Sequence, residues 1–383
     1  MIYILVLFSL KGFAQDSISK NTTPPPEIHG YLKYMNQFSF VDDATINSST
    51  SLIHNRLNFK WSPQHWLLRI GARNRIFYGD QLKSNPVFIK NIANDQGAIN
   101  MSKVWVDGYG LGAVSFIDRA LINYTNQHWD ITLGRQRINW GVNMVWNPND
   151  VFNTYIFFDF DYEERPGSDA IRIQYIWKGF SAIEVAAKKG KTKNDYTTAI
   201  MFRSNKKGYD YQLLSGLAGK DLFEGIGWAG NIKNAGFKGE ITYFHPYKNL
   251  NDTNGILSSC ISFDYGFNKG WYMNLSVYYN SNGSKNISFL STQQFFDVSA
   301  KQLLPFKYSI FIHIMKQINP LLTIGLSNIY SATNNTCIIL PNIQYDLATN
   351  WEISLIGQSF FASENNVYRS FGNSIFLRLK WSF

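Results

Sequence analysis

Side chains along many short segments of this chain alternate between apolar and polar, and this period of two limits the fold more than any other feature. In 271–280, one face carries Trp, Met, Leu, Val and Tyr, whereas the other is mainly polar. In 375–383, Ile, Leu, Leu, Trp and Phe share one face. Successive side chains of a β-strand point to opposite sides of the sheet. Each segment is therefore predicted to be a strand with one apolar face.

The links between the predicted strands alternate in length. The link after every even-numbered strand is tight, as at 62–63, 126–127 and 233–234. The links after odd-numbered strands vary and are longest at 80–112, 141–167 and 282–303. Short turns on one side and long loops on the other are typical of bacterial outer-membrane barrels. The pattern predicts an all-β chain, a transmembrane antiparallel β-barrel of about 18 strands from 27–40 to 367–383.

Two alternatives compete with this prediction. Three segments, 180–190, 195–204 and 222–232, are short or weakly patterned, so about 16 strands is the alternative count. A soluble sandwich would also alternate, but only 16% of the residues are charged, which is low for a soluble protein. An aromatic girdle at the membrane interface explains the tryptophans found at strand ends. These are Trp66, Trp129, Trp177, Trp271, Trp351 and Trp381.

The N-terminal residues indicate export from the cytoplasm. Residues 1–14 hold a short apolar run with a small-residue cleavage site after Ala14, as in a signal peptide. The positive n-region is missing, so our interpretation includes a start codon misassigned within a longer signal. Residues 15–26 are polar, end in three prolines and are expected to form a flexible leader. The barrel is expected to occupy 27–383, in the outer membrane of a Gram-negative bacterium.

Catalytic and metal-binding patterns are weak in this sequence. Cys260 and Cys337 lie far apart with opposite strand parity, and the six histidines are scattered. Strand parity brings no nucleophile, base and orienting group together, so we expect no enzyme, no metal and no cofactor. The net charge of +9 is spread over many strands rather than held in one patch, which argues against nucleic-acid binding.

Basic residues with lumen-facing parity form the candidate functional site. They are Arg56, Lys60, Arg69, Arg73, Arg75, Arg119 and Arg172. Arg135 and Arg137 share the parity of the lipid-facing Leu133, so a bulge at Gly134 would have to turn both inward; otherwise they lie at the extracellular rim. A lipid-facing arginine at mid-membrane costs about 2–4 kcal/mol, which excludes that placement.

These cations allow two interpretations. Guanidinium groups along one wall would attract anions and offer bidentate contacts to carboxylate or phosphate. Alternatively, the arginines pair with acidic loop residues and only hold a loop in the lumen. The candidate residues of such a constriction loop, within 141–167, are Asp150, Asp159, Asp161, Glu163 and Glu164. This loop either folds back into the pore, facing the basic wall, or stays on the surface.

One stretch resembles a known class of protein. Gly134-Arg135-Gln136-Arg137-Ile138-Asn139-Trp140-Gly141, continuing through 146–150 to 164–170, resembles bacterial outer-membrane porin-like barrels. Its Gly-Arg-Gln core is similar to a stretch of the alginate-export porin family. The resemblance implies a monomeric barrel of about 18 strands with an occluding loop. For the alginate exporters it also implies an arginine-lined path for an anionic polysaccharide. The terminal Phe383 resembles the C-terminal aromatic signal that the barrel-assembly machinery reads.

Two functional hypotheses follow from the sequence. The first is a porin-like channel for passive diffusion of small, preferentially anionic solutes. The second is a barrel plugged by 80–112 and 141–167 that acts in polysaccharide export or in an envelope assembly. The expected partners are outer-membrane lipid, the barrel-assembly machinery, and either small solutes or an anionic glycan.

Overall fold

The computed structural model is almost entirely β-structure. It describes residues 23–40, 46–154, 167–177, 181–192, 195–248, 254–284, 298–333, 335–364 and 367–383. The first ten strands are Glu27–Phe40 (β1), Ile46–Trp61 (β2), Trp66–Gly79 (β3), Ser102–Gly108 (β4), Leu111–Thr125 (β5), Trp129–Gln136 (β6), Ser168–Trp177 (β7), Ser181–Lys189 (β8), Tyr196–Lys206 (β9) and Tyr209–Ala218 (β10). The others are Asp221–Ile232 (β11), Ala235–Pro246 (β12), Ile256–Phe267 (β13), Trp271–Asn280 (β14), Tyr308–Asn319 (β15), Leu322–Ser331 (β16), Thr336–Ala348 (β17), Trp351–Glu364 (β18) and Val367–Ser382 (β19).

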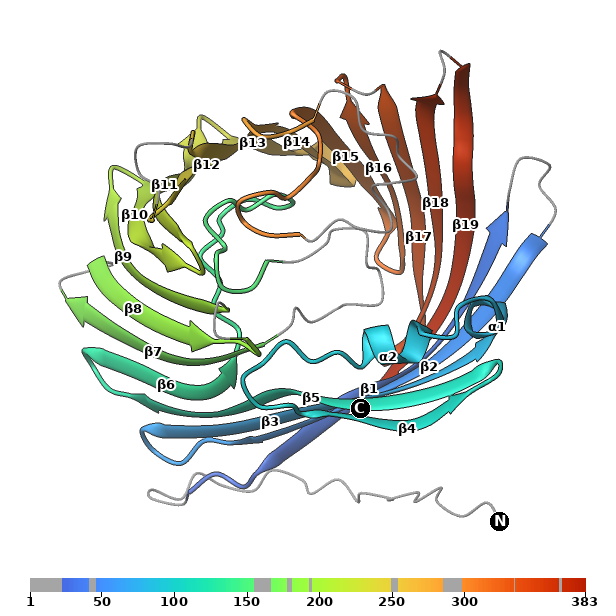
Figure 1. Cartoon of the computed structure of the whole chain (residues 1–383), viewed down its shortest axis with the longest axis horizontal. Helices are drawn as coiled ribbons and strands as arrows, with labels where there is room; N and C mark the ends of the chain where they lie inside the picture. Colours follow the sequence, from blue (N-terminus) through green and yellow to red (C-terminus); the bar gives the residue numbers. More distant parts are fainter. Residues whose placement is uncertain are drawn as a thin grey trace.

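The sheet closes on itself as an 18-stranded antiparallel barrel, as the alternation predicted. β1 pairs with β2 on one side and with β19 on the other, so the first and last strands seal the ring. The final residue completes this seal, because Phe383 and Gly30 exchange two backbone hydrogen bonds of 2.9 Å. The alternative count of about 16 strands is excluded. Figure 1 shows the ring of strands from one end.

Residues 80–112, expected to be one long link between barrel strands, contain ordered elements. Two short helices, Asp80–Ser84 (α1) and Phe88–Ile92 (α2), lie on the lumen side of the wall. β4 then pairs with the upper part of β5, above the short strand β6. β4 is therefore an appendage to β5 rather than a further strand of the closed ring. β6 ends at Gln136.

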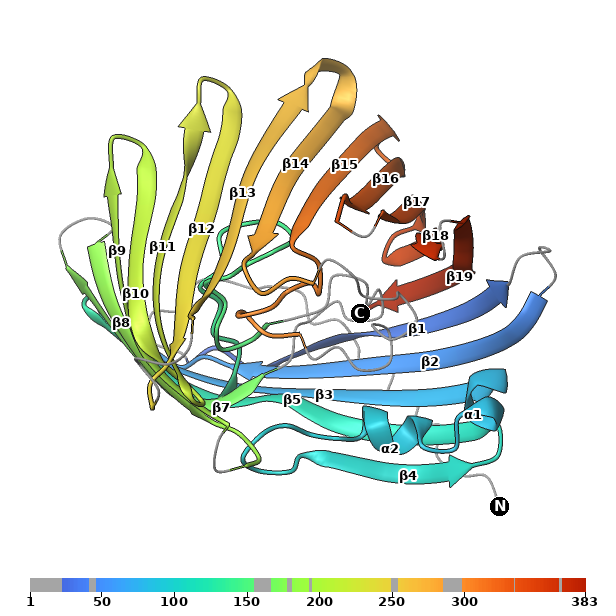
Figure 2. The same cartoon turned by 45° about the horizontal axis from the view of Figure 1, so that its top comes forward.

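Tight turns gather at one end of the barrel. Five non-glycine residues in these turns have positive φ: Gln64, Lys207, Lys233, Lys269 and Asn350. Two-residue turns that match the twist of a hairpin need such left-handed backbone, so the turns fix the strand register at this end. Figure 2 shows three of these turns at the upper rim, where they join β9 to β10, β11 to β12 and β13 to β14. The short-turn end of an outer-membrane barrel faces the periplasm.

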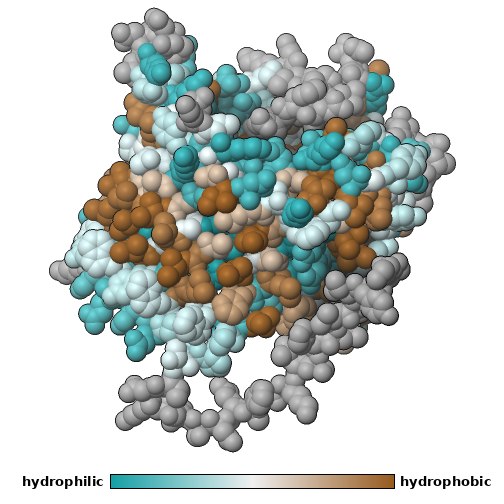
Figure 3. All heavy atoms as spheres, turned by 60° about the horizontal axis from the view of Figure 1, so that its bottom comes forward, coloured by the Kyte–Doolittle hydropathy of each residue, from teal (hydrophilic) through white to brown (hydrophobic). Residues whose placement is uncertain are grey.

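The outer face of the barrel is apolar. Ile53, Ile200, Val277 and Leu377 are among many large hydrophobic side chains that remain exposed on it. Aromatic rings line the periplasmic end, where Trp351 and Trp381 stack with centroids 6.0 Å apart. Figure 3 shows hydrophobic residues gathered across the middle of one outer face, with hydrophilic residues toward its ends. This apolar belt is the surface that an outer-membrane barrel presents to lipid. Among the described residues, no helix is long and apolar enough to cross a bilayer.

The lumen has two unlike sides. We call the wall from β7 to β17 the packed side, because the segments 138–152 and 300–306 are buried against it in two hydrophobic clusters. In Figure 1 these segments occupy the lumen beside β8 to β17. We call the wall formed by β18, β19, β1, β2, β3 and β5 the charged side. Its lumen face carries the basic residues described next.

Candidate functional site

A row of basic residues crosses the charged side. Lys380 on β19 stands directly opposite Lys33 on β1, Lys33 opposite His54 on β2, and His54 opposite Arg75 on β3. The ring of Tyr31 lies against this row, because the Nζ atoms of Lys33 and Lys380 are 5.6 and 5.2 Å from its centroid. Cation–π contact of this kind lowers the cost of holding two lysines side by side.

A buried ion-pair network lies next to the basic row. Arg56 and Arg73 stand opposite each other on β2 and β3, and Asp118 of β5 bridges them. The carboxylate accepts from Arg56 Nη1 at 2.9 Å and from Arg73 Nη2 at 3.1 Å. Its position follows from a register shift between β3 and β5, which lets Asp118 and Arg119 both be buried on the lumen side. Gly71 leaves space for Arg56, since a Cβ there would lie 3.0 Å from the Arg56 Nη2.

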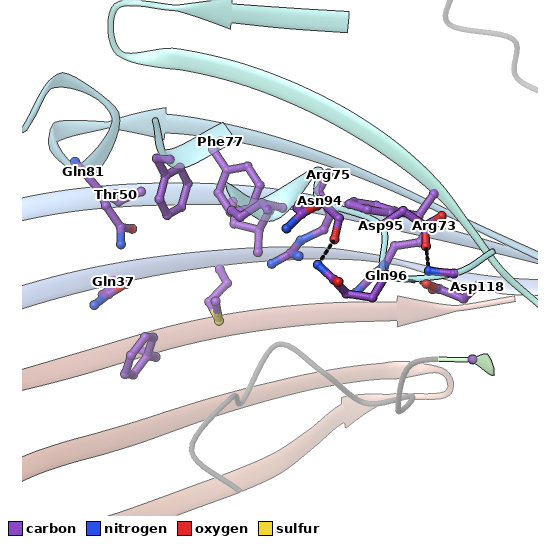
Figure 4. Close-up of a pocket in the computed structure, with 18 of the residues that line it drawn as sticks. Gln37, Thr50, Arg73, Arg75, Phe77, Gln81, Asn94, Asp95, Gln96 and Asp118 are labelled. Carbon is purple, nitrogen blue, oxygen red and sulfur yellow. Dashed lines mark hydrogen bonds and ion pairs between the residues drawn. The ribbon is translucent and has the colours of Figure 1, made fainter. Parts of the chain in front are cut away.

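A cavity of about 610 Å³ opens in front of this wall. Arg73 lies 4.9 Å from the ring centroid of Phe116, and Arg75 lies 4.9 Å from that of Phe77. Phe88 and Phe376 add further apolar lining. Figure 4 shows Arg73 and Arg75 on one side of this cavity, with Asn94, Asp95 and Gln96 on the segment beside them. The cavity thus combines guanidinium groups with phenyl faces, which suits a solute that has both an anionic group and an apolar ring.

The other predicted basic residues are spread around the barrel. Lys60 pairs with Glu27 at the periplasmic rim, at 3.2 Å, and Arg69 stands opposite Lys60. Arg172 lies on the lumen side of β7 and pairs with Asp130 at 2.7 Å. These residues are therefore not part of the cavity wall that holds Arg73 and Arg75.

Arg135 and Arg137 have different environments. Gly134 has φ of +112°, and Arg135 after it is buried and reaches the 610 Å³ cavity. Arg137 lies beyond the end of β6 and is exposed. Of the two arginines, only Arg135, which directly follows the positive-φ Gly134, is placed inward.

The described part of the long loop 141–167 lies inside the barrel. The carboxylate of Glu240, on β12, accepts backbone N–H groups of Val142 at 2.5 Å, Asn143 at 3.0 Å and Asn149 at 2.8 Å. Trp140 Nε1 donates to Glu184 on β8 at 2.7 Å. Buried carboxylates therefore anchor the start of the loop to the packed side.

The acidic candidates of this loop fall into two groups, one inside and one outside the described residues. Asp150 is buried within the loop, with 1% of its surface exposed. Asp159, Asp161, Glu163 and Glu164 lie outside the described residues. The ion pairs described here join the arginines to strand residues such as Asp118 and Asp130, and to Asp95 on the segment between α2 and β4.

Sequence reasoning missed several residues of this site. Asp118 has the parity opposite to that of the lumen-facing Arg119, and the register shift between β3 and β5 that turns it inward leaves no mark in the sequence. Glu240 lies in a strand of ordinary alternation, and only its parity signalled a lumen position. Strand parity also indicated a lumen position for Lys33. In the part of the chain that the structure describes, no group of three or more His, Cys, Asp or Glu residues could hold a metal ion.

No family model and no curated protein matches this chain. Solved structures do match, and three of them are proteins of Pseudomonas aeruginosa. OprD superposes with a TM-score of 0.57 at 9% identity, over 94% of this chain and 95% of that one. OccK7 (OpdD) gives 0.56 at 9% identity, over 94% and 98%. OpdK with vanillate gives 0.57 at 9% identity, over 93% and 98%.

At such low identity the likeness concerns the fold. This chain therefore has the porin-like fold that the sequence predicted, and an outer-membrane location agrees with it. The similarity of Gly134-Arg135-Gln136 to the alginate-export porins stays a prediction, as does recognition of Phe383 by the barrel-assembly machinery.

Proposed function

We propose that this protein is an outer-membrane channel for passive diffusion of small solutes and that it prefers anions. The observation that supports this proposal best is the basic row Lys380, Lys33, His54 and Arg75. Lys380 lines a cavity at the periplasmic end, and Arg75 lines the 610 Å³ cavity at the other end of the row. Lys33 and His54 between them are buried, so an anion would meet positive charge at the two cavities that Arg75 and Lys380 line.

The chemistry of the larger cavity favours small organic anions with an apolar ring. Arg73 and Arg75 each lie over a phenyl ring, and the cavity volume is typical of small-molecule sites. Vanillate, present in the OpdK structure that shares this fold, is such an anion. An inorganic anion and an aromatic carboxylate can therefore be compared as test solutes.

The test is conductance and ion selectivity in planar bilayers. The wild-type barrel should conduct, and its reversal potential in a KCl gradient should show preference for chloride over potassium. Arg75→Gln combined with Lys380→Gln removes both ends of the basic row, and the permeability ratio of anion to cation should fall several-fold. Lys316→Gln is the matched control, because Lys316 lies over Trp271 at the outer periplasmic rim. A folded wild-type barrel with neither conductance nor solute flux would rule out the channel.

A plugged barrel is the second candidate function, acting in polysaccharide export or in an envelope assembly. The packed side favours it, because the loop from Ile138 to Phe152 is buried there rather than lying loosely in the lumen. Deleting 141–167 should then open a barrel that is closed in the wild type, and a stoichiometric partner should be recovered with the intact protein. Unchanged conductance after the deletion, with no partner, would count against this candidate.

A further inference from the structure

A short segment of the chain crosses between the two sides of the lumen. Residues 94–101, which we call the strap, connect α2 with β4. Gly97 forms an isolated antiparallel bridge with Gly190, next to the end of β8. Lys191 reinforces this contact, because its backbone N–H donates to Gln96 O at 3.1 Å and its Nζ donates to Asn94 Oδ1 at 2.9 Å.

The strap separates two cavities. Gln96 and Gly97 line the 610 Å³ cavity of the charged side, where Figure 4 shows Gln96 facing the pocket. The same two residues line a cavity of about 440 Å³, bounded by Phe152, Lys188 and the segment 298–301. The strap therefore lies, with Gly167, at the boundary that the two cavities share.

Arg135 holds the strap in place with one guanidinium group. Its Nη1 donates to Asp95 Oδ2 at 2.7 Å, and its Nη2 donates to Ile99 O at 2.6 Å, so it binds the strap at two points. On the barrel wall it donates to both carboxylate oxygens of Asp169, at 2.7 and 2.9 Å, and to Ile117 O at 3.2 Å. One side chain thus joins β5, β6, β7 and the strap.

The two carboxylates around Arg135 also fix the backbone of the strap. Asp95 accepts N–H groups of Gly97 at 2.8 Å and Met101 at 2.7 Å, and Asp169 accepts that of Ile99 at 3.0 Å. Packing is close enough that only glycine fits at position 97, since a Cβ there would overlap the Arg135 guanidinium. The strap therefore has one position relative to the wall as long as Arg135 keeps its contacts.

We propose that Arg135 is a positioning residue for permeation, which keeps the strap as the partition between the two cavities. This inference rests on the proposed channel function. The N–H groups of Arg135 donate to the strap and to the wall, so its role is to set the geometry of the path rather than to bind the solute. Loss of these Arg135 contacts joins the two cavities and widens the path of the solute.

The first test compares Arg135→Gln with Arg137→Gln in bilayers. Arg137 is two residues away and exposed, so its variant removes the same charge without touching the strap. Arg135→Gln should raise single-channel conductance and reduce discrimination between small and large anions, whereas Arg137→Gln should match the wild type. Asp95→Asn is the second variant, because it weakens one of the two points at which Arg135 binds the strap and leaves the Arg135–Asp169 pair of the wall intact. It keeps the proposal testable if Arg135→Gln does not fold.

A local readout separates a moving strap from a general loss of stability. The amide hydrogens of Gly97, Ile99 and Met101 should exchange at least about ten-fold faster in Asp95→Asn, while amides of β1 and β19 stay protected. A cross-link between Gln96→Cys and Lys191→Cys, added to Asp95→Asn, should restore the wild-type conductance. These two residues flank the Gly97–Gly190 bridge on opposing backbones, where a disulfide can form.

The outcomes distinguish the two proposals. If the wild type conducts and neither Arg135→Gln nor Asp95→Asn changes conductance or selectivity, the role of Arg135 is refuted and the channel stands. If the wild type is closed and Asp95→Asn opens it, the partition is supported and the open-channel proposal fails. A cross-linked variant that stays as conductive as Asp95→Asn alone would also refute the strap as the partition.

Discussion

The packed side and the charged side of the lumen are built from the same kind of strand but are filled in different ways. On the packed side, Trp146 and Phe152 fill the lumen against strand residues such as Phe244, and carboxylates anchor the backbone of the loop. On the charged side, arginines pair with Asp118 and a cavity remains in front of them. Apolar side chains from a loop exclude water, whereas paired charges keep the wall polar. One side of this lumen is therefore filled by the loop, and a cavity remains on the other side.

The largest effect should come from Asp118→Asn, on the charged side. The substitution leaves Arg56 and Arg73 buried without the carboxylate that bridges them, and breaking a buried ion pair costs about 3–5 kcal/mol. We expect the free energy of unfolding in lipid vesicles, measured by urea titration, to fall by this amount. Asp346→Asn is the control, because Asp346 is exposed near the periplasmic end. Equal stability of the two variants would mean that the network does not hold the charged side together.

A smaller effect should come from Glu240→Gln, on the packed side. The amide of glutamine presents only one oxygen to the three N–H groups that the carboxylate now accepts. A hydrogen bond to a charged group contributes about 1.5–3 kcal/mol, and we expect a loss of about one such bond. The loop should then leave the packed side transiently, seen as added noise in single-channel current. Glu224→Gln, which changes an exposed residue on the outer face of β11, should leave the current unchanged.

The smallest effect should come from Lys60→Gln, at the rim where the two sides meet the periplasm. Lys60 and Glu27 are both exposed, and exposed ion pairs contribute about 0–1 kcal/mol. Stability and selectivity should therefore stay within error of the wild type. A large fall in anion preference would show that the rim, and not the wall around Arg75, sets the selectivity.

The strand pattern made most of the barrel predictable from sequence. Alternation placed Arg56, Arg73 and Arg75 on the lumen side, and tight links such as 233–234 gave the strand count, because period and turn length are local properties of the chain. The register shift that turns Asp118 inward depends on how β5 pairs with β3, and the strap depends on contacts between residues far apart in sequence. Neither leaves a periodic signal.

The sequence by itself determined that the chain forms a closed sheet with an apolar outside and a basic strip inside. The period of two requires a sheet, and a sheet that faces lipid must close to satisfy its backbone hydrogen bonds. The tertiary structure alone decided what the basic strip does: Arg135 became a clamp, Arg73 a paired wall residue and Arg137 an exposed charge. A charge acquires its role from the partners that folding brings to it, and those partners come from distant strands and loops.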